Sequence, residues 1–134
     1  MEWRFKEYRL TDNRSEVDID VVHHLVSTSY WAMGRSKSVV EKTVENSLCF
    51  SLFLNEDQIG FARVVTDYAV FAWIADVVIH PNHRGKGLGK FLIEVIDQHP
   101  DVPDDLKLLR TKDAHTLYER FGFERGEYLN KEQA

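Results

Sequence analysis

A change of hydrophobic pattern near residue 80 constrains the fold of this 134-residue chain most strongly. Before it lie three apolar runs rich in β-branched and aromatic residues, at 48–54, 58–66 and 70–80. Short runs at such close spacing predict an antiparallel meander. After it, apolar residues recur at i, i+3, i+4, i+7 and i+8, namely Leu88, Phe91, Leu92, Val95 and Ile96. This spacing predicts an amphipathic helix, so the loop between joins a strand to a helix.

The rest of the chain predicts a mixed α/β sheet with helices on its faces. Ser38 and Glu41 have the spacing of a capping box at a helix start. Asp113 is the expected N-cap of a short helix, and Gly122 its C-cap. The further expected elements are strands over about 3–9, 106–111 and 123–129, and helices over about 15–30, from 38, and over 113–121.

Length and charge narrow the class of protein. The 134 residues fit one domain, 1–134. The net charge of −5 and the lack of a basic block argue against nucleic acid, and the acidic balance mildly favours an amine substrate. No apolar run reaches the roughly 20 residues that span a bilayer, and no signal peptide is recognisable, so we expect a cytoplasmic protein without a membrane partner. Cys49, the only cysteine, lies in an apolar run and is expected to be a buried, inert thiol.

The segment 80–90 contains the most informative motif. Glycines alternate at 85, 87 and 89, and they let backbone N–H groups approach an anion at a helix N-terminus. Arg84, Lys86 and Lys90 add positive charge, so the loop predicts a phosphate or pyrophosphate site. It is not a P-loop, and Lys90 stands where a dinucleotide-binding loop would need glycine.

Two motifs resemble the GNAT superfamily of acyltransferases. Arg84-Gly85-Lys86-Gly87-Leu88-Gly89 resembles its R/Q-x-x-G-x-G/A signature, and the segment 114–123 resembles its A-x-x-x-Y-x-x-x-G-F segment. The run Asp76-Val77-Val78-Ile79-His80-Pro81 looks like the family's fourth strand. The likeness covers about residues 70–125, and Thr111 departs from it where the family often has asparagine.

This resemblance implies a GNAT-like fold in the order β-α-α-β-β-β-α-β-α-β and acetyl-CoA as the acyl donor. The family's donor site lies on the glycine loop and on the fourth strand, where a backbone N–H near Val78 would hold the oxyanion. The implied acetyl-CoA-binding residues are Val77, Val78, Ile79, Arg84, Gly85, Lys86, Gly87, Leu88, Gly89 and Lys90.

Tyr118 and Asp76 are the candidate catalytic residues. By resemblance, Tyr118 is the general acid that faces the thioester sulfur, although its spacing alone also fits a core tyrosine. Desolvation could raise the pKa of Asp76 so that it serves as the base. Asp76 could equally pair with a basic neighbour such as Arg63, and Asp67 or an ordered water are the other candidates for the base.

The acceptor is expected to be a primary amine of a small molecule or a peptide. Tyr30, Trp31, Arg35 and Trp73 are candidates for its pocket, with Arg35 able to bind a carboxylate, although the aromatic residues could instead pack in the core. His80 and His83 lack a clear third ligand, so no metal is expected. The alternative functions are a non-catalytic CoA-binding or sensing module and a phosphate-binding domain. A homodimer is possible.

Overall fold

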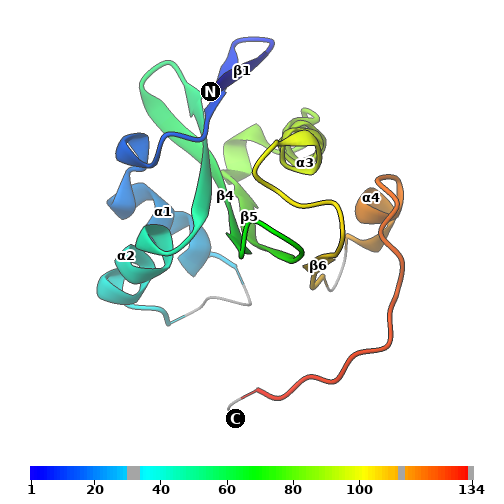
Figure 1. Ribbon diagram of the computed structural model, residues 1–134. Helices are drawn as coiled ribbons and strands as arrows, with labels where there is room; N and C mark the ends of the chain where they lie inside the picture. Colours follow the sequence, from blue (N-terminus) through cyan, green and yellow to red (C-terminus); the bar gives the residue numbers. More distant parts are fainter. Residues whose placement is uncertain (30–33, 112–113, 133–134) are drawn as a thin grey trace.

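One mixed sheet organises the computed structural model, which describes residues 1–29, 34–111 and 114–132 (Figure 1). Six strands lie in sequence order across it. Neighbouring strands are antiparallel, except that β5 and β6 are parallel. The strands are β1 (Glu2–Phe5), β2 (Tyr8–Thr11), β3 (Leu48–Leu54), β4 (Asp57–Thr66), β5 (Ala72–Ile79) and β6 (Lys107–Leu109).

The helices cover both faces of the sheet. In Figure 1, α1 and α2 lie on one side of it and α3 and α4 on the other. The α-helices are α1 (Ile19–Ser27), α2 (Lys37–Glu45), α3 (Leu88–Gln98) and α4 (His115–Glu119), and the short 3₁₀ turns are η1 (Arg14–Glu16) and η2 (Pro81–His83). Because parallel strands need a long crossover, α3 connects β5 to β6.

Each face of the sheet has its own apolar core. On one face, Leu92 and Ile96 of α3 pack in a cluster with Phe50 of β3. On the other, the α1 residue Leu25 shares a cluster with Phe61 and Val78. Burying such side chains contributes about 1.5–3 kcal/mol each. The two clusters anchor β5 from both sides, and this fixes the strand that the functional site uses.

The structure confirms the mixed α/β fold and the central meander, but it corrects several boundaries. The first segment is a hairpin and not one strand, because Lys6 turns the chain with a φ of 54°. Asp18 caps α1, which therefore begins at Ile19 and not near residue 15. Ser36, and not Ser38, caps α2 by accepting from the Val39 N–H.

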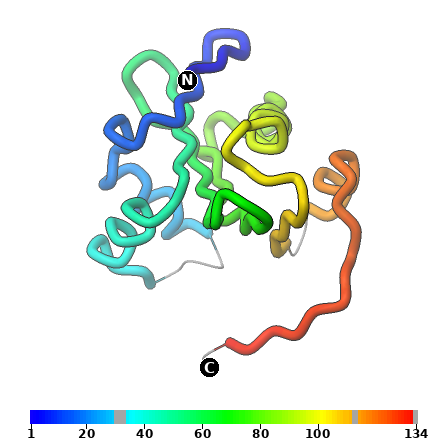
Figure 2. Tube along the Cα trace, viewed as in Figure 1, coloured from blue at the N-terminus to red at the C-terminus, as the bar shows by residue number. Residues whose placement is uncertain are grey.

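The C-terminal segment also differs from expectation. Gly122 has a φ of 88°, as expected after a helix. Beyond it, residues 123–132 form neither helix nor strand, so the predicted strand over 123–129 is wrong. Figure 2 shows this segment running out from α4 in extended form. The predicted N-cap Asp113 lies outside the described residues, and Thr111 Oγ1 accepts from the Ala114 N–H at 3.0 Å.

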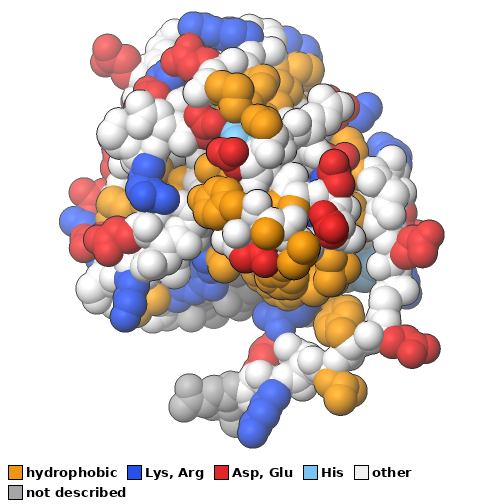
Figure 3. Space-filling model, in the orientation of Figure 1, with side chains coloured by type: hydrophobic (Ala, Val, Ile, Leu, Met, Phe, Trp, Pro, Cys, Tyr) orange, Lys and Arg blue, Asp and Glu red, His pale blue; other side chains and the backbone are white. Residues whose placement is uncertain are grey.

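The surface mixes charged and apolar side chains. On the face shown in Figure 3, apolar atoms gather where the β4–β5 turn and the segment before β6 lie. Tyr68, Val70 and Leu106 are the large exposed apolar residues of these segments. Among the described residues, no helix has the length and apolar character needed to cross a membrane.

Candidate active site

The site begins at an irregularity in β5. Phe61 of β4 pairs with Val78, whereas Arg63 pairs with Ala75, so one residue of β4 faces two of β5 between these pairs. Asp76 lies in this bulge with a φ of 52°. Few side chains adopt that left-handed conformation, and aspartate is among those that tolerate it. A bulge bends its strand and redirects side chains, so Asp76 marks the point where β5 turns.

The same strand loses its other neighbour just before the bulge. β5 pairs with β6 at Ala72, Trp73 and Ile74, and this pairing ends at Ile74 and Leu109. The part of β5 beyond Ile74 therefore has one edge that β6 does not cover. Backbone groups on such an edge can bind an extended ligand as an added strand would.

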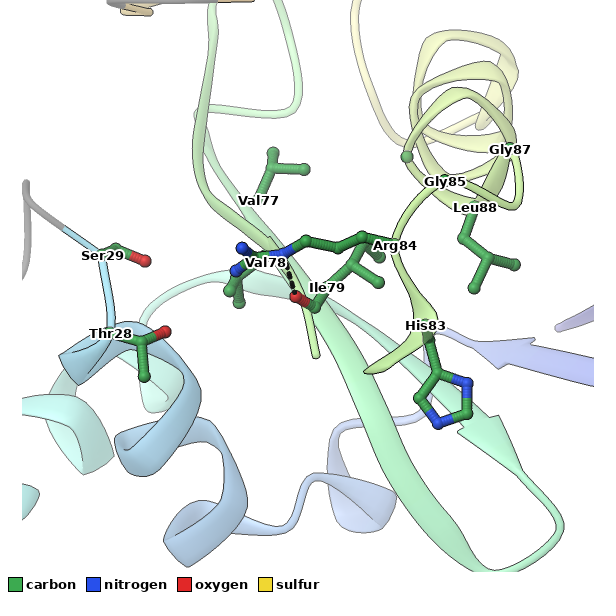
Figure 4. A pocket seen from close by; sticks show the side chains of 11 residues that line it. Thr28, Ser29, Val77, Val78, Ile79, His83, Arg84, Gly85, Gly87 and Leu88 are labelled. Carbon is green, nitrogen blue, oxygen red and sulfur yellow. Dashed lines mark hydrogen bonds between the residues drawn. The ribbon is translucent and has the colours of Figure 1, made fainter. Parts of the chain in front are cut away.

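A cleft of about 470 Å³ lies beside this edge. In Figure 4, three elements surround it: the end of α1, the second half of β5 and the loop before α3. Its lining residues are Thr28, Ser29, Val77, Val78, Ile79, His83, Arg84, Gly85, Gly87, Leu88 and Gly89. The structure thus brings the glycine loop and the predicted strand residues together in one cleft. We call it the donor cleft.

The glycine loop leaves the N-terminus of α3 open toward the donor cleft. Gly85 and Gly87 have φ values of 79° and 81°, which favour glycine. Gly87 is the N-cap of α3 and provides no side-chain hydrogen bond. The first N–H groups of a helix lack intrahelical partners and carry partial positive charge. A Cβ built at Gly85 or Gly89 meets no atom within 4 Å, so the space over the loop is free for a phosphate.

The charged side chains of this loop differ in position. Arg84 lies over the end of β5, and its Nε donates to the Ile79 carbonyl oxygen at 3.1 Å (Figure 4). Lys86 and Lys90 are exposed and do not line the donor cleft. Of the basic residues that the motif contributes, Arg84 is therefore the one that lines the cleft.

A second pocket, of about 310 Å³, lies on the other side of the bulge. We call it the acceptor pocket. It brings together Asp76 and Tyr118, the two predicted catalytic residues, with Arg35 and Trp73 from the predicted acceptor site. The remaining lining residues are Arg63, Ile74, Ala75, Val77, Leu109, Arg110, Thr111, Ala114 and Leu117. Val77 also lines the donor cleft, so the two spaces meet at this residue.

Asp76 is held by two arginines inside the acceptor pocket. Its Oδ2 accepts from Arg63 Nε at 2.6 Å and from Arg35 Nη1 at 2.8 Å. Burial acts to raise the pKa of Asp76, but the charges and hydrogen bonds of Arg63 and Arg35 outweigh it and lower the pKa below its ordinary value. Of the two alternatives for Asp76, the raised pKa is therefore wrong, and the pairing with Arg63 is confirmed. A carboxyl group that holds its proton so weakly is a weak general base.

Tyr118 reaches the acceptor pocket from α4. It is partly buried against the core cluster of α3, and its ring packs edge-on against Phe123 at 6.0 Å between centroids. Its helix begins at His115, directly after Ala114, which also lines the pocket. Tyr118 thus has a packing role and a place in the pocket at the same time.

Several residues fall elsewhere or were missed. Tyr30 and Trp31 lie outside the described residues. Asp67 belongs to the β4–β5 turn, where its Oδ1 accepts N–H groups of Ala69, Val70 and Phe71. Sequence reasoning did not assign Thr28 and Ser29 to the donor cleft or Arg110 to the acceptor pocket, because no local motif marks them.

The histidines near the loop make other contacts. Nδ1 of His83 lies 2.9 Å from the Tyr8 hydroxyl oxygen, and His80 Nδ1 accepts from the Asn82 N–H. Within residues 1–29, 34–111 and 114–132, no group of three or more His, Cys, Asp or Glu side chains could hold a metal ion.

Comparison with known proteins agrees with this geometry. The family model of the acetyltransferase (GNAT) domain matches residues 45–125. The uncharacterized N-acetyltransferase ycf52 of Pyropia yezoensis is 30% identical over an alignment of 125 residues that covers 89% of this chain and 71% of that protein. Its counterpart from Gracilaria tenuistipitata var. liui is 34% identical and is covered over 54% of its length.

A solved structure agrees over nearly the whole chain. A GNAT-family protein of Xanthomonas campestris pv. campestris superposes with a TM-score of 0.90 at 34% identity, covering 98% of this chain and 96% of that one. The chain therefore belongs to the GNAT family and is an acetyltransferase by class. Members of this family generally use acetyl-CoA as their acetyl donor.

Proposed function

We propose that this protein is an N-acetyltransferase that moves an acetyl group from acetyl-CoA to a primary amine by direct attack in a ternary complex. One observation carries the proposal: the donor cleft and the acceptor pocket meet at Val77, beside the bulge of β5. Direct transfer requires that both reactants be held in contact at one point. An open glycine loop on one side and Tyr118 on the other fit that requirement.

The donor cleft suits the phosphates and the extended arm of acetyl-CoA. The free N–H groups at the start of α3 would hold the pyrophosphate, as helix N-termini hold anions. The uncovered edge of β5 from Val77 to Ile79 would bind the arm through backbone hydrogen bonds. When bound, acetyl-CoA supplies the acetyl group as an activated thioester. Arg84 adds the nearest positive charge.

The acceptor pocket would orient the amine and manage the proton. Tyr118 is proposed to donate its phenolic proton to the departing sulfur. A backbone N–H near Val78 is proposed to stabilise the oxyanion. Because the pKa of Asp76 is lowered, we assign removal of the amine proton to water, and we assign Asp76 the task of holding Arg35 and Arg63 in place.

Calorimetry of acetyl-CoA binding tests the donor site. Gly89 lines the cleft without a positive φ, and a Cβ there meets open space, so Gly89→Glu should fold while placing a carboxylate where phosphate would bind. We expect binding about tenfold weaker or more, because like charges meet in the cleft. Gly126→Glu is the matched control, since it adds the same side chain in open space outside that cleft.

Four outcomes separate the candidate functions. Binding that Gly89→Glu abolishes, together with acetylation of amines by the wild-type protein, supports the proposal. Binding without turnover on a broad amine panel would favour the non-catalytic CoA module. Failure of the folded wild-type protein to bind acetyl-CoA would contradict the proposal. Equal competition by inorganic phosphate would favour the phosphate-binding domain.

A further inference from the structure

The acceptor pocket contains more positive than negative charge. Arg35, Arg63 and Arg110 line it, and Asp76 is the one acidic residue among the described lining residues. Three positive charges and one negative charge give a net charge of +2. Outside the lining, Glu132 of the C-terminal segment pairs with Arg110, and counting it reduces the excess to +1.

The two undescribed segments inside the chain add no net formal charge to the sequence. Residues 30–33 carry no formal charge, and residues 112–113 carry one charge of each sign. The whole chain is acidic at −5, so the pocket differs in sign from the protein as a whole. A local excess of arginine inside an acidic protein indicates a site for an anion.

The arginines also have donors left for a ligand. Arg35 uses Nη1 for Asp76, and Arg63 uses Nε for Asp76 and Nη1 for Ser47 Oγ at 3.2 Å. A guanidinium group has five N–H donors and binds carboxylates in pairs of parallel hydrogen bonds. Asp76 holds both guanidinium groups at the pocket wall, so their remaining N–H groups are oriented in advance.

From this arrangement we infer that the acceptor is a small amine that carries a carboxylate, as amino acids do, and that Arg35 is its main anchor. The inference rests on the proposed function and adds the substrate class. One carboxylate balances the remaining charge of +1 that the pocket has when Glu132 is counted. Of the two arginines that Asp76 holds in place, Arg35 is the anchor because its side chain is 26% exposed, whereas that of Arg63 is 13% exposed. Arg110 is held instead by Glu132, which lies outside the pocket lining.

The same charges help the reaction. A cationic environment disfavours the ammonium form of the acceptor and so lowers its pKa, which increases the fraction of neutral amine that can attack. A diamine or polyamine would bring a second positive charge next to the arginines and would be repelled. The net charge of the pocket is thus opposite in sign to the net charge of the whole chain.

The test compares three amines with the same carbon chain: one that carries a carboxylate, one that carries no second charged group, and one that carries a second amine. The first set is 4-aminobutanoate, butylamine and 1,4-diaminobutane, and sets on shorter and longer chains and the α-amino acids with their amides follow. Binding to the CoA-saturated protein is measured by calorimetry, and turnover by the release of free CoA thiol. We expect the carboxylated member to be favoured about tenfold or more over its neutral partner. Equal use of all three members, preference for the diamine, or no binding of any carboxylated amine would overturn the inference.

The substitution Arg35→Gln tests whether Arg35 binds the carboxylate of the acceptor. We expect the KM for the carboxylated amine to rise about tenfold or more beyond any rise for the neutral amine, because only the carboxylated amine loses a partner in Arg35. Arg4→Gln is the control, because Arg4 is exposed on β1 and outside both spaces. Arg35→Lys, which keeps the charge, should recover part of the loss and covers the case in which Arg35→Gln is unstable. An equal effect of Arg35→Gln on charged and neutral amines would contradict the role of Arg35. Failure of the wild-type protein to bind acetyl-CoA would instead contradict the proposed function.

Discussion

Arg63 donates from its Nε to Oδ2 of Asp76 at 2.6 Å and thereby ties β4 to β5 at the bulge. Arg35, from the loop before α2, donates to the same oxygen at 2.8 Å. This ion triad holds the strand beside Val77, where the donor cleft and the acceptor pocket meet. Three residues that are distant in sequence are thus tied together at the bulge of β5.

Asp76→Asn should destabilise the protein. Removing one member of a buried ion pair leaves the partner charge uncompensated, and the side chains of Asp76 and Arg63 are only 4% and 13% exposed. We expect the free energy of unfolding at pH 7 to fall by about 3 kcal/mol, measured by urea denaturation. Asp105→Asn, an exposed control, should change it by less than about 0.5 kcal/mol. Equal effects of the two substitutions would show that the triad contributes no stability.

The stability that Asp76 contributes should disappear in acid. Its pKa in the folded protein is lowered. Its contribution is therefore complete above the unfolded pKa of about 3.9 and is lost as the pH falls through the folded value. The difference in unfolding free energy between the wild-type protein and Asp76→Asn should be largest near neutral pH and should narrow below pH 4. A difference that stays constant down to pH 2 would contradict the assigned ion triad.

The lowered pKa of Asp76 also predicts the pH dependence of the rate. Because this carboxylate is already ionised at neutral pH, its titration should cause no inflection in kcat/KM between about pH 5 and pH 8. The rate should rise with pH until the amine itself is neutral. An inflection near pH 6 in the wild-type enzyme that is absent in Asp76→Asn would instead identify Asp76 as the general base.

Tyr118→Phe separates catalysis from packing. Loss of the hydroxyl group should lower kcat about 100-fold, the lower end of general acid contributions, while acetyl-CoA binding remains unchanged. Tyr68→Phe is the matched control, because Tyr68 is 58% exposed in the β4–β5 turn. Full activity of Tyr118→Phe would leave Tyr118 with its packing role alone, and weaker acetyl-CoA binding would place it in the donor site.

Cys49 should be unreactive in the folded protein. It is buried, and burial raises the pKa of its thiol to about 11. The native protein should therefore not react with a thiol reagent such as Ellman's reagent at pH 8, and it should react once per chain in urea. The same result means that assays of released CoA thiol have no background from the enzyme. Rapid labelling of the native protein would contradict the burial of Cys49.

The glycine loop, the meander and α3 could be predicted from the sequence because local patterns specify them. The spacing of Leu88, Leu92 and Val95 determines which face of α3 is buried. Alternating glycines before that helix indicate a loop whose backbone needs positive φ values, and both Gly85 and Gly87 have positive φ. Other boundaries were wrong where two local signals compete, as between Ser36 and Ser38 at the start of α2.

Only the tertiary structure decided the direction of the pKa shift of Asp76 and which residues line the acceptor pocket. Arg35 and Arg63 lie 41 and 13 residues from Asp76 in the chain, and the sign of the shift in its pKa depends on how closely the fold brings their charges to it. In the same way, Arg110 joins the pocket only because β6 lies beside β5. The sequence by itself determined the glycine loop, because the loop consists of residues that are neighbours in the chain. The charge of the acceptor pocket was decided by the fold, because electrostatic interactions depend on distance in space and not on distance along the chain.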